Sequence, residues 1–213
     1  MAGNRRRTTG YRAQKVAAIA AFGIVLLSGA GVASLAAWTD TEWVQGGVGT
    51  DPGISTSVFR IQQNTTTGST GWVDEPDSPG GVIAFVDASG LTPGDTAYGF
   101  VRLRTVDDSL AGTVTLNESA LAGANSLYGA LRYGAGIVAS TAECSAAQFG
   151  AGDDGLVPFD TALSADVAPT FSIAADSSAE RIVCFAVTLP AGSPSTLQGL
   201  TTTPEWYFEA ESS

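Results

Sequence analysis

Beyond its first 37 residues the chain consists of short apolar runs separated by turn-forming residues. The runs are rich in Val, Ile, Phe, Tyr and Thr, and Gly, Pro, Asp and Ser interrupt them, which is typical of strands and turns. No stretch shows the spacing of an amphipathic helix. The strand candidates are residues 54–62, 81–87, 97–105, 112–117, 127–139, 170–174, 180–189 and 205–209. This spacing predicts an all-β protein, a single β-sandwich that is jelly-roll-like.

Two of these strands predict which face meets the core. In a strand, successive side chains point to opposite faces. The predicted core face of 180–189 carries Val183, Phe185, Val187 and Leu189. In 97–105, Val101 and Leu103 oppose a face with two arginines, which we expect to meet water.

The N-terminus has the order of a signal peptide. Five basic residues precede an apolar run from Val16 to Leu27, and small residues follow it. We expect residues 1–37 to be removed by a signal peptidase, with cleavage after Ala36 or Ala37, and residues 38–213 to form one secreted domain. The alternative is an uncleaved membrane anchor, because the uncharged stretch is long enough to span a bilayer.

Removing the leader changes the charge of the chain. All 21 acidic residues lie beyond Ala37, where only five arginines remain, so the secreted part carries a formal charge of −16. Such a surface repels phosphate backbones and anionic lipids. We therefore expect no nucleic acid among the partners and no electrostatic binding to membranes. Because the leader is expected to be removed, we also expect no transmembrane segment in the mature protein.

The two cysteines, Cys144 and Cys184, suit one disulfide in an oxidising compartment. The alternative is a pair of free, buried thiols.

Missing residue types argue against most catalytic designs. The chain contains no histidine, and its only lysine lies in the leader. Paired-histidine metal sites, nucleophiles activated by His or Lys, and Schiff bases therefore cannot be built. We expect no enzymatic activity and no cofactor.

Two weaker chemical signals remain. Acidic clusters offer oxygen ligands for calcium, although no EF-hand loop is present. They are Asp74, Glu75 and Asp77; Asp107 and Asp108; and Asp153 and Asp154. Trp72, Tyr128 and Tyr133 are candidates for stacking on sugar rings, with core or loop packing as the alternative.

The expected cleavage site resembles a known type. Ala36 and Ala37 precede Trp38, and Thr39, Asp40, Thr41 and Glu42 follow it. Small residues before an aromatic, a hydroxyl residue and acidic residues resemble the SipW-type signal peptides of the TasA and camelysin family of secreted bacterial proteins. The turn at 91–95 and the final strand at 205–212 are similar to that family as well.

The resemblance implies a β-sandwich or jelly-roll subunit of biofilm matrix fibres or surface layers, processed by a specialised signal peptidase between Ala37 and Trp38. It also implies self-association, in which the N-terminal segment, residues 38–49, pairs as a strand with the next subunit. We expect Trp38, Trp43 and Val44 to be its apolar anchors, and Asp40 and Glu42 to lie between them. The alternatives are a disordered end and an edge strand of the same chain.

The expected function is therefore a structural protein of the bacterial cell surface or biofilm matrix, in contact with cell-wall or matrix polymers. The metalloprotease activity described for camelysins is not carried over, because the chain lacks histidine. The rival interpretation is a monomeric carbohydrate-binding or adhesive β-sandwich module.

Overall fold

A computed structural model describes residues 47–48, 51–52, 56–118, 125–147 and 155–213. The chain separates into two compact units, residues 1–53 and 54–213. In the first unit the description covers one small hairpin, in which β1 (Gly47–Val48) pairs with β2 (Asp51–Pro52). The second unit holds all the other elements.

The regular secondary structure described in the second unit is mostly β-strand, with almost no helix. Its described strands are β3 (Ile61–Asn64), β4 (Thr96–Thr105), β5 (Gly112–Glu118), β6 (Arg132–Val138), β7 (Val157–Ala162), β8 (Thr170–Ile173), β9 (Arg181–Thr188) and β10 (Trp206–Ser212). Three short helical turns join them: α2 (Ser126–Ala130), η1 (Thr141–Glu143) and η2 (Ser195–Leu197). None of the helices described in this chain is long and apolar enough to cross a membrane.

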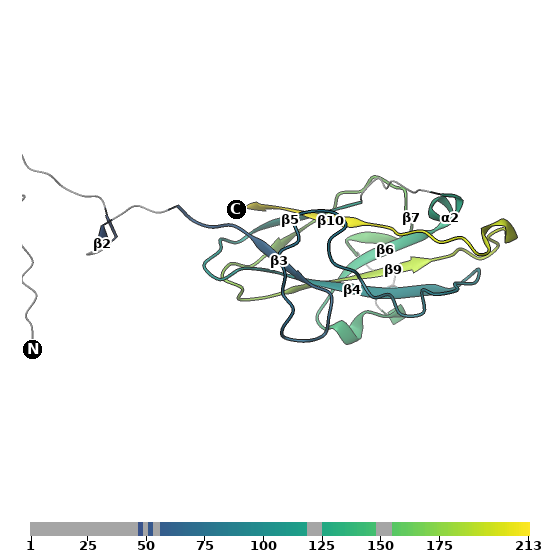
Figure 1. Ribbon diagram of the computed structural model, residues 1–213, viewed down its shortest axis with the longest axis horizontal. Coiled ribbons are helices and arrows are strands. Elements are labelled where there is room, and N and C mark those ends of the chain that lie inside the picture. Colours follow the sequence, from purple (N-terminus) through teal and green to yellow (C-terminus); the bar gives the residue numbers. More distant parts are fainter. Residues whose placement is uncertain (1–46, 49–50, 53–55, 119–124, 148–154) are drawn as a thin grey trace, which may run out of the picture. The chain divides into compact units, whose positions relative to one another are not determined.

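The strands form two antiparallel sheets (Figure 1). The larger sheet has the order β3-β4-β9-β6-β7, and the smaller one has the order β10-β5-β8. The all-β sandwich that the sequence predicts is confirmed. The jelly-roll arrangement stays a prediction.

The core lies between the two sheets, where alternate residues of each strand meet. Along β4, residues alternate strictly between half-buried and buried, and Val101 and Leu103 are each 1% exposed. In β5, Val114 and Leu116 point inward, while Thr113 and Thr115 face outward. The predicted core faces of β4 and β9 are confirmed. The expectation that the arginine face of β4 meets water is wrong for Arg102, whose side chain is 12% exposed, because Trp72 packs over Arg102 and Arg104.

The outer face of β9 is also buried. Cys184 lies there between Phe100 of β4 and Gly136 of β6, and it forms a disulfide with Cys144, with 5.3 Å between the Cα atoms. Ile182 and Val138 pack in the same small cluster. The disulfide that the sequence predicts is confirmed, and it holds the segment after β6 over the middle of the larger sheet.

Several strand predictions are correct and others are wrong. The expected strands at 97–105, 112–117, 170–174, 180–189 and 205–209 correspond to β4, β5, β8, β9 and β10. The expected strand at 54–62 is confirmed only at its end, where β3 begins at Ile61. The sequence analysis missed β7, whose central residues are exposed and so show little apolar alternation.

Two predicted strands need physical correction. The single strand at 127–139 is interrupted, because Asn125 caps the short helix α2 by accepting a hydrogen bond from the Tyr128 amide, at 3.0 Å. The segment 81–87 forms no strand beyond one isolated bridge, between Val86 and Tyr98. It keeps an alternating pattern, with Ile83 and Phe85 inward and Val82 81% exposed, but it lies across β4 at Gly99.

Reducing the disulfide should destabilise the domain. The bridge closes a loop with a sequence separation of 40 residues, so the chain-entropy model gives a contribution of about 3 to 4 kcal/mol. Urea unfolding of the mature protein, followed by circular dichroism, should show a lower midpoint in the presence of reductant. The double variant Cys144→Ala/Cys184→Ala should be insensitive to the reductant. An unchanged wild-type midpoint would contradict the expectation.

Candidate functional site

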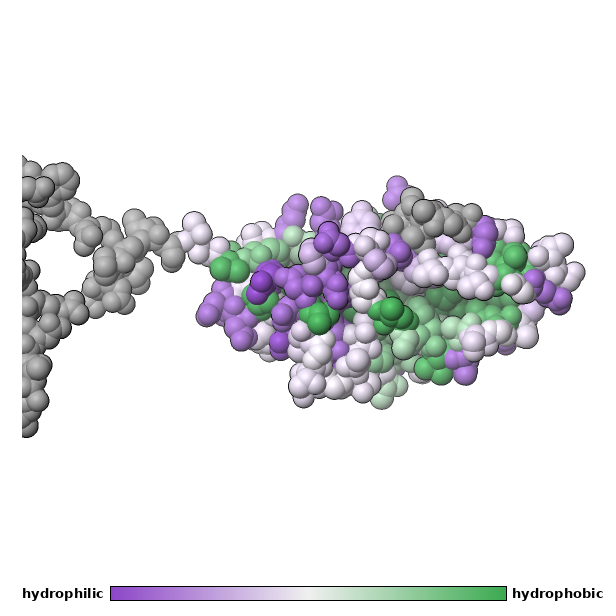
Figure 2. All heavy atoms as spheres, viewed as in Figure 1, coloured by the Kyte–Doolittle hydropathy of each residue, from purple (hydrophilic) through white to green (hydrophobic). Residues whose placement is uncertain are grey.

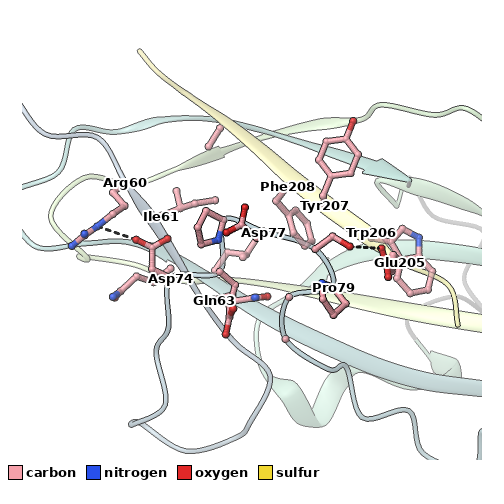
Figure 3. A pocket seen from close by; sticks show the side chains of 18 of the residues that line it. Arg60, Ile61, Gln63, Asp74, Asp77, Pro79, Glu205, Trp206, Tyr207 and Phe208 are labelled. Carbon is pink, nitrogen blue, oxygen red and sulfur yellow. Dashed lines mark hydrogen bonds and ion pairs between the residues drawn. The ribbon is translucent and has the colours of Figure 1, made fainter. Parts of the chain in front are cut away.

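One side of the sandwich is open between the edge strands of the two sheets. β3 is the outermost strand of the larger sheet and β10 is the outermost strand of the smaller one. Both line a cavity of about 520 Å³, together with residues 74–81 (Figure 3). We call this cavity the edge groove.

The walls of the edge groove come from alternating positions of β10. Trp206 and Phe208 are half-buried and pack against the core, whereas Tyr207 is 51% exposed and points to the opposite side of the strand (Figure 3). Gln63 of β3 faces them from the other sheet. The edge groove therefore opens directly onto the core.

Charged side chains line the mouth of the edge groove. Arg60 forms an ion pair with Asp74 at 3.5 Å, and Ser78 donates a hydrogen bond to Glu205 at 3.1 Å. Glu75 and Asp77 add two more carboxylates to the lining, which contains one arginine. The mouth is therefore acidic.

A second, larger cavity continues from the edge groove. It measures about 910 Å³, and the two cavities share Trp206, Glu205 and residues 79–81. Its sides are the segments 79–93 and 193–206, and its floor is formed by Ala97, Val187 and Leu189. We call it the apolar groove. Figure 2 shows hydrophobic residues gathered in a hollow on the right-hand half of the domain.

Trp206 forms the junction between the two grooves. Its ring lies 4.6 Å from the ring of Phe185, 5.9 Å from that of Tyr133 and 6.1 Å from that of Phe85, measured between centroids. These contacts join β10, β9, β6 and the segment 79–93. The indole Nε1 is buried without a hydrogen-bond partner, which is an energetic cost that the aromatic packing offsets.

The segment 79–93 is held at both ends of its contact with the larger sheet. At one end, a Cβ on Gly99 would come within 2.7 Å of Ile83 Cγ2, so the glycine permits the close approach. At the other end, the turn at 91–95 bonds to the end of β9: the Gly94 amide donates to the Leu189 carbonyl at 2.7 Å, and the Leu189 amide donates to the Asp95 carbonyl at 3.1 Å.

Asp95 fixes the turn itself. Its carboxylate accepts hydrogen bonds from the hydroxyl and the amide of Thr92, at 2.7 and 2.8 Å. These bonds favour the charged form, so they lower the pKa of Asp95 below its ordinary value, and the hydroxyl has the larger effect. The expected turn at 91–95 is therefore present, and it forms part of the rim of the apolar groove.

The segment 193–206 is fixed by local hydrogen bonds and by α2. The Ser193 amide donates to the Pro190 carbonyl at 3.2 Å, and Leu197 of η2 is 8% exposed. The side chain of Asn125, which caps α2, donates to the Thr201 carbonyl at 2.8 Å. Hydrogen bonds and the packing of buried side chains therefore order both sides of the apolar groove.

The sequence-predicted site residues fall into two groups. Cys144 and Cys184 form their disulfide. The expected cleavage residues Ala36, Ala37 and Trp38, and the assembly residues Asp40, Glu42, Trp43 and Val44, lie outside the described residues. Of the segment 38–49, only Gly47–Val48 is described, and it pairs with Asp51–Pro52.

The aromatic candidates for sugar binding lie in other environments. Tyr128 is 7% exposed and Tyr133 is 1% exposed, so both are parts of the core. Trp72 stacks with the guanidinium groups of Arg104 and Arg102, at 4.2 and 5.0 Å from the ring centroid. These arginines occupy positions against the ring at which a sugar would stack.

The acidic clusters do not converge in the part of the chain that the structure describes. Within it, no group of three or more His, Cys, Asp or Glu side chains is placed to hold a metal ion. Asp74 is paired with Arg60, and Asp107 accepts a short hydrogen bond from Ser177. Asp153 and Asp154 lie outside the described residues.

Comparisons with known proteins give no assignment. No protein-family model matches the chain, and a search of curated proteins found no significant match. The geometry of the grooves is therefore the structural basis for a functional proposal.

The sequence analysis missed both grooves. One signal was available: Ile83 and Phe85 alternate with Val82 and Val86 between proline- and glycine-rich stretches, a pattern that also predicts a strand. The edge positions of β3 and β10 depend on pairings between residues far apart in the sequence, so no local pattern indicates them.

Thr92→Val should raise the pKa of Asp95. The substitution removes the stronger of the two hydrogen bonds and keeps the backbone one, so the carboxyl should titrate closer to its ordinary value than in the wild type. Because the folded-state pKa is lowered, the stabilisation by Asp95 is complete above the unfolded-state pKa and is lost as the pH falls through the folded-state pKa.

Carboxyl NMR titration of both proteins measures this directly. Asp95→Asn is the control, because it should remove that part of the acid-induced drop in melting temperature. A wild-type Asp95 that titrates at or above its ordinary value would contradict the expectation.

Proposed function

We propose that the chain is a secreted structural protein of the bacterial cell surface or biofilm matrix, and that it assembles into fibres through its N-terminal segment. The observation that carries this proposal is the open side of the sandwich, where two edge strands flank a groove that leads to the core.

Among the described residues, no strand pairs with the outer edge of β10. Its seven residues pair with β5 on one side, and β10 is the last strand of its sheet on the other. An edge strand exposes amide and carbonyl groups that an added strand can satisfy. The edge groove runs beside this edge, so an added strand would also cover apolar side chains of the core.

The N-terminal segment can supply the strand that is added to β10. Cleavage before Trp38 would leave about 18 residues ahead of Thr56, where the continuous description of the sandwich begins. With the small hairpin β1–β2 opened and the stretch fully extended, it spans roughly 60 Å. It is therefore long enough to reach a neighbouring subunit.

The leader and the missing lysines bear on where the protein lies and how it is attached. The leader supports export, and the absence of lysine from residues 38–213 leaves no amine side chain for isopeptide cross-links. Association with cell-wall or matrix polymers would therefore be non-covalent. Because the expected mature chain lacks both histidine and lysine, we propose a structural role and not a catalytic one.

Removing the N-terminal segment should prevent assembly. Electron microscopy of the mature protein beginning at Trp38 should show fibres, and a version lacking residues 38–49 should remain monomeric. The shortened protein keeps the groove, so it should bind the free segment of an intact subunit and cap fibre ends in mixtures. Circular dichroism and the reductant-dependent unfolding midpoint serve as controls for its fold. Monomers from the intact protein in every condition would exclude the proposal.

Fibre growth should accelerate as salt is added. Each subunit carries a formal charge of −16 after cleavage, and the Debye length falls from about 30 Å at 0.01 M ionic strength to about 8 Å at 0.15 M. Light scattering measures the growth rate. Calcium and magnesium at matched ionic strength separate general screening from a specific calcium effect. Slower growth in higher salt would contradict the electrostatic expectation.

A further inference from the structure

The N-terminal segment has two chemically different faces when it is extended. Alternate side chains of a strand point in opposite directions. One face carries Thr39, Thr41 and Trp43, and none of these residues is charged. The other face carries Trp38, Asp40, Glu42 and Val44. The two tryptophans therefore lie on opposite faces of the strand.

The apolar groove accepts only one of these faces. Its lining contains a single charged residue, Glu205, and otherwise consists of aliphatic, aromatic, small and uncharged polar side chains. Burying an unpaired carboxylate against such a lining is costly, and Glu205 would repel it as well. The face with Asp40 and Glu42 is therefore excluded.

The edge groove also excludes the face with Asp40 and Glu42. It carries four carboxylates, and its one arginine is already paired with Asp74. Arg60 therefore offers little free charge to Asp40 or Glu42. Along both grooves, the acidic face of an added strand is stable only in solvent.

We infer that Trp43 of a second copy inserts into the apolar groove and anchors the added strand, while the face with Trp38, Asp40, Glu42 and Val44 stays in solvent. This inference rests on the proposed function, because it assumes that the segment pairs between subunits. It revises the expectation that Trp38, Trp43 and Val44 act together as anchors. The cavity of about 910 Å³ lies in the range of sites that enclose a sizeable ligand.

A second copy is the occupant that the chain itself supplies. Each mature subunit carries one N-terminal segment and one apolar groove. A head-to-tail contact therefore leaves a free N-terminal segment at one end of the assembly and a free apolar groove at the other. The uncharged face of the segment matches the lining of the apolar groove, in which Glu205 is the single charged residue among those described, and its outward face keeps the carboxylates hydrated. Repetition of this contact produces a fibre.

Matched tryptophan variants of the mature protein test the face assignment. Trp43→Ala should raise the critical concentration for assembly at least about tenfold, as expected for a buried aromatic anchor. Trp38→Ala should change it much less, although the same side chain is removed from the same segment. Sedimentation of fibres from soluble subunits measures both values.

A matched pair of leucine variants tests the groove. Leu200 lines the apolar groove and Leu110 lines neither cavity, and both are 40% exposed. Leu200→Glu places a charge in the groove and should block assembly of that protein with itself. It keeps an intact N-terminal segment and should still add once to a wild-type fibre end. Leu110→Glu adds the same charge elsewhere and should assemble with at most a small delay.

The outcomes separate the inference from the proposed function. If the wild type forms no fibres, both are overturned. If fibres form but Trp38→Ala is as damaging as Trp43→Ala, or Leu200→Glu assembles as well as Leu110→Glu, only the inference fails. Tryptophan fluorescence provides the remaining check. A blue shift that depends on Trp43 and persists in dilute monomers would show that the segment docks on its own chain, and it would overturn the second-copy assignment.

Discussion

The burial of β9 on both faces is the constraint on which the rest of the structure depends. Its inner face supplies Val183, Phe185 and Val187 to the core between the sheets, and its outer face holds Ile182 and the cystine. It pairs with β4 on one side and β6 on the other, so its displacement would disrupt the centre of the larger sheet. The disulfide is therefore placed where it secures the most heavily packed strand.

The unequal sizes of the two sheets explain the grooves. A three-stranded sheet lies against a five-stranded one, and the end of the larger sheet near Ala97 and Leu189 is covered by two irregular segments. Those segments pack through a few side chains, such as Ile83, Phe85 and Leu197, and not through a full hydrogen-bonded ladder. The space between them is the apolar groove, and Trp206 marks where strand packing ends and segment packing begins.

Local patterns were sufficient for the fold class and insufficient for the site. The alternation in β4 correctly identified its core face, because burial on one side selects apolar residues there. The core face of β9 was also identified correctly, although both of its faces are buried. The same logic failed at 81–87, where inward Ile83 and Phe85 reflect packing of an irregular segment over Gly99 and not a ladder. The helix α2 was missed because its start depends on one capping residue, Asn125. The strand β7 was missed because exposed residues dominate its sequence. The grooves follow from strand order, which arises from contacts between distant parts of the chain.

The acidic surface and the open edge of β10 belong to one physical argument. An unpaired edge next to an apolar groove invites pairing with any extended chain, and proteins commonly prevent this with charge. Here Glu209 and Glu211 lie on the outer face of β10, while Glu205 and Asp77 lie at the groove. A strand with carboxylates on both faces would be repelled at the groove and on the outer face, whereas one that turns an uncharged face to the groove meets only Glu209 and Glu211, whose repulsion salt screens. The same negative charge that keeps subunits apart in dilute solution thus favours an added strand whose alternation turns its acidic residues away from the groove.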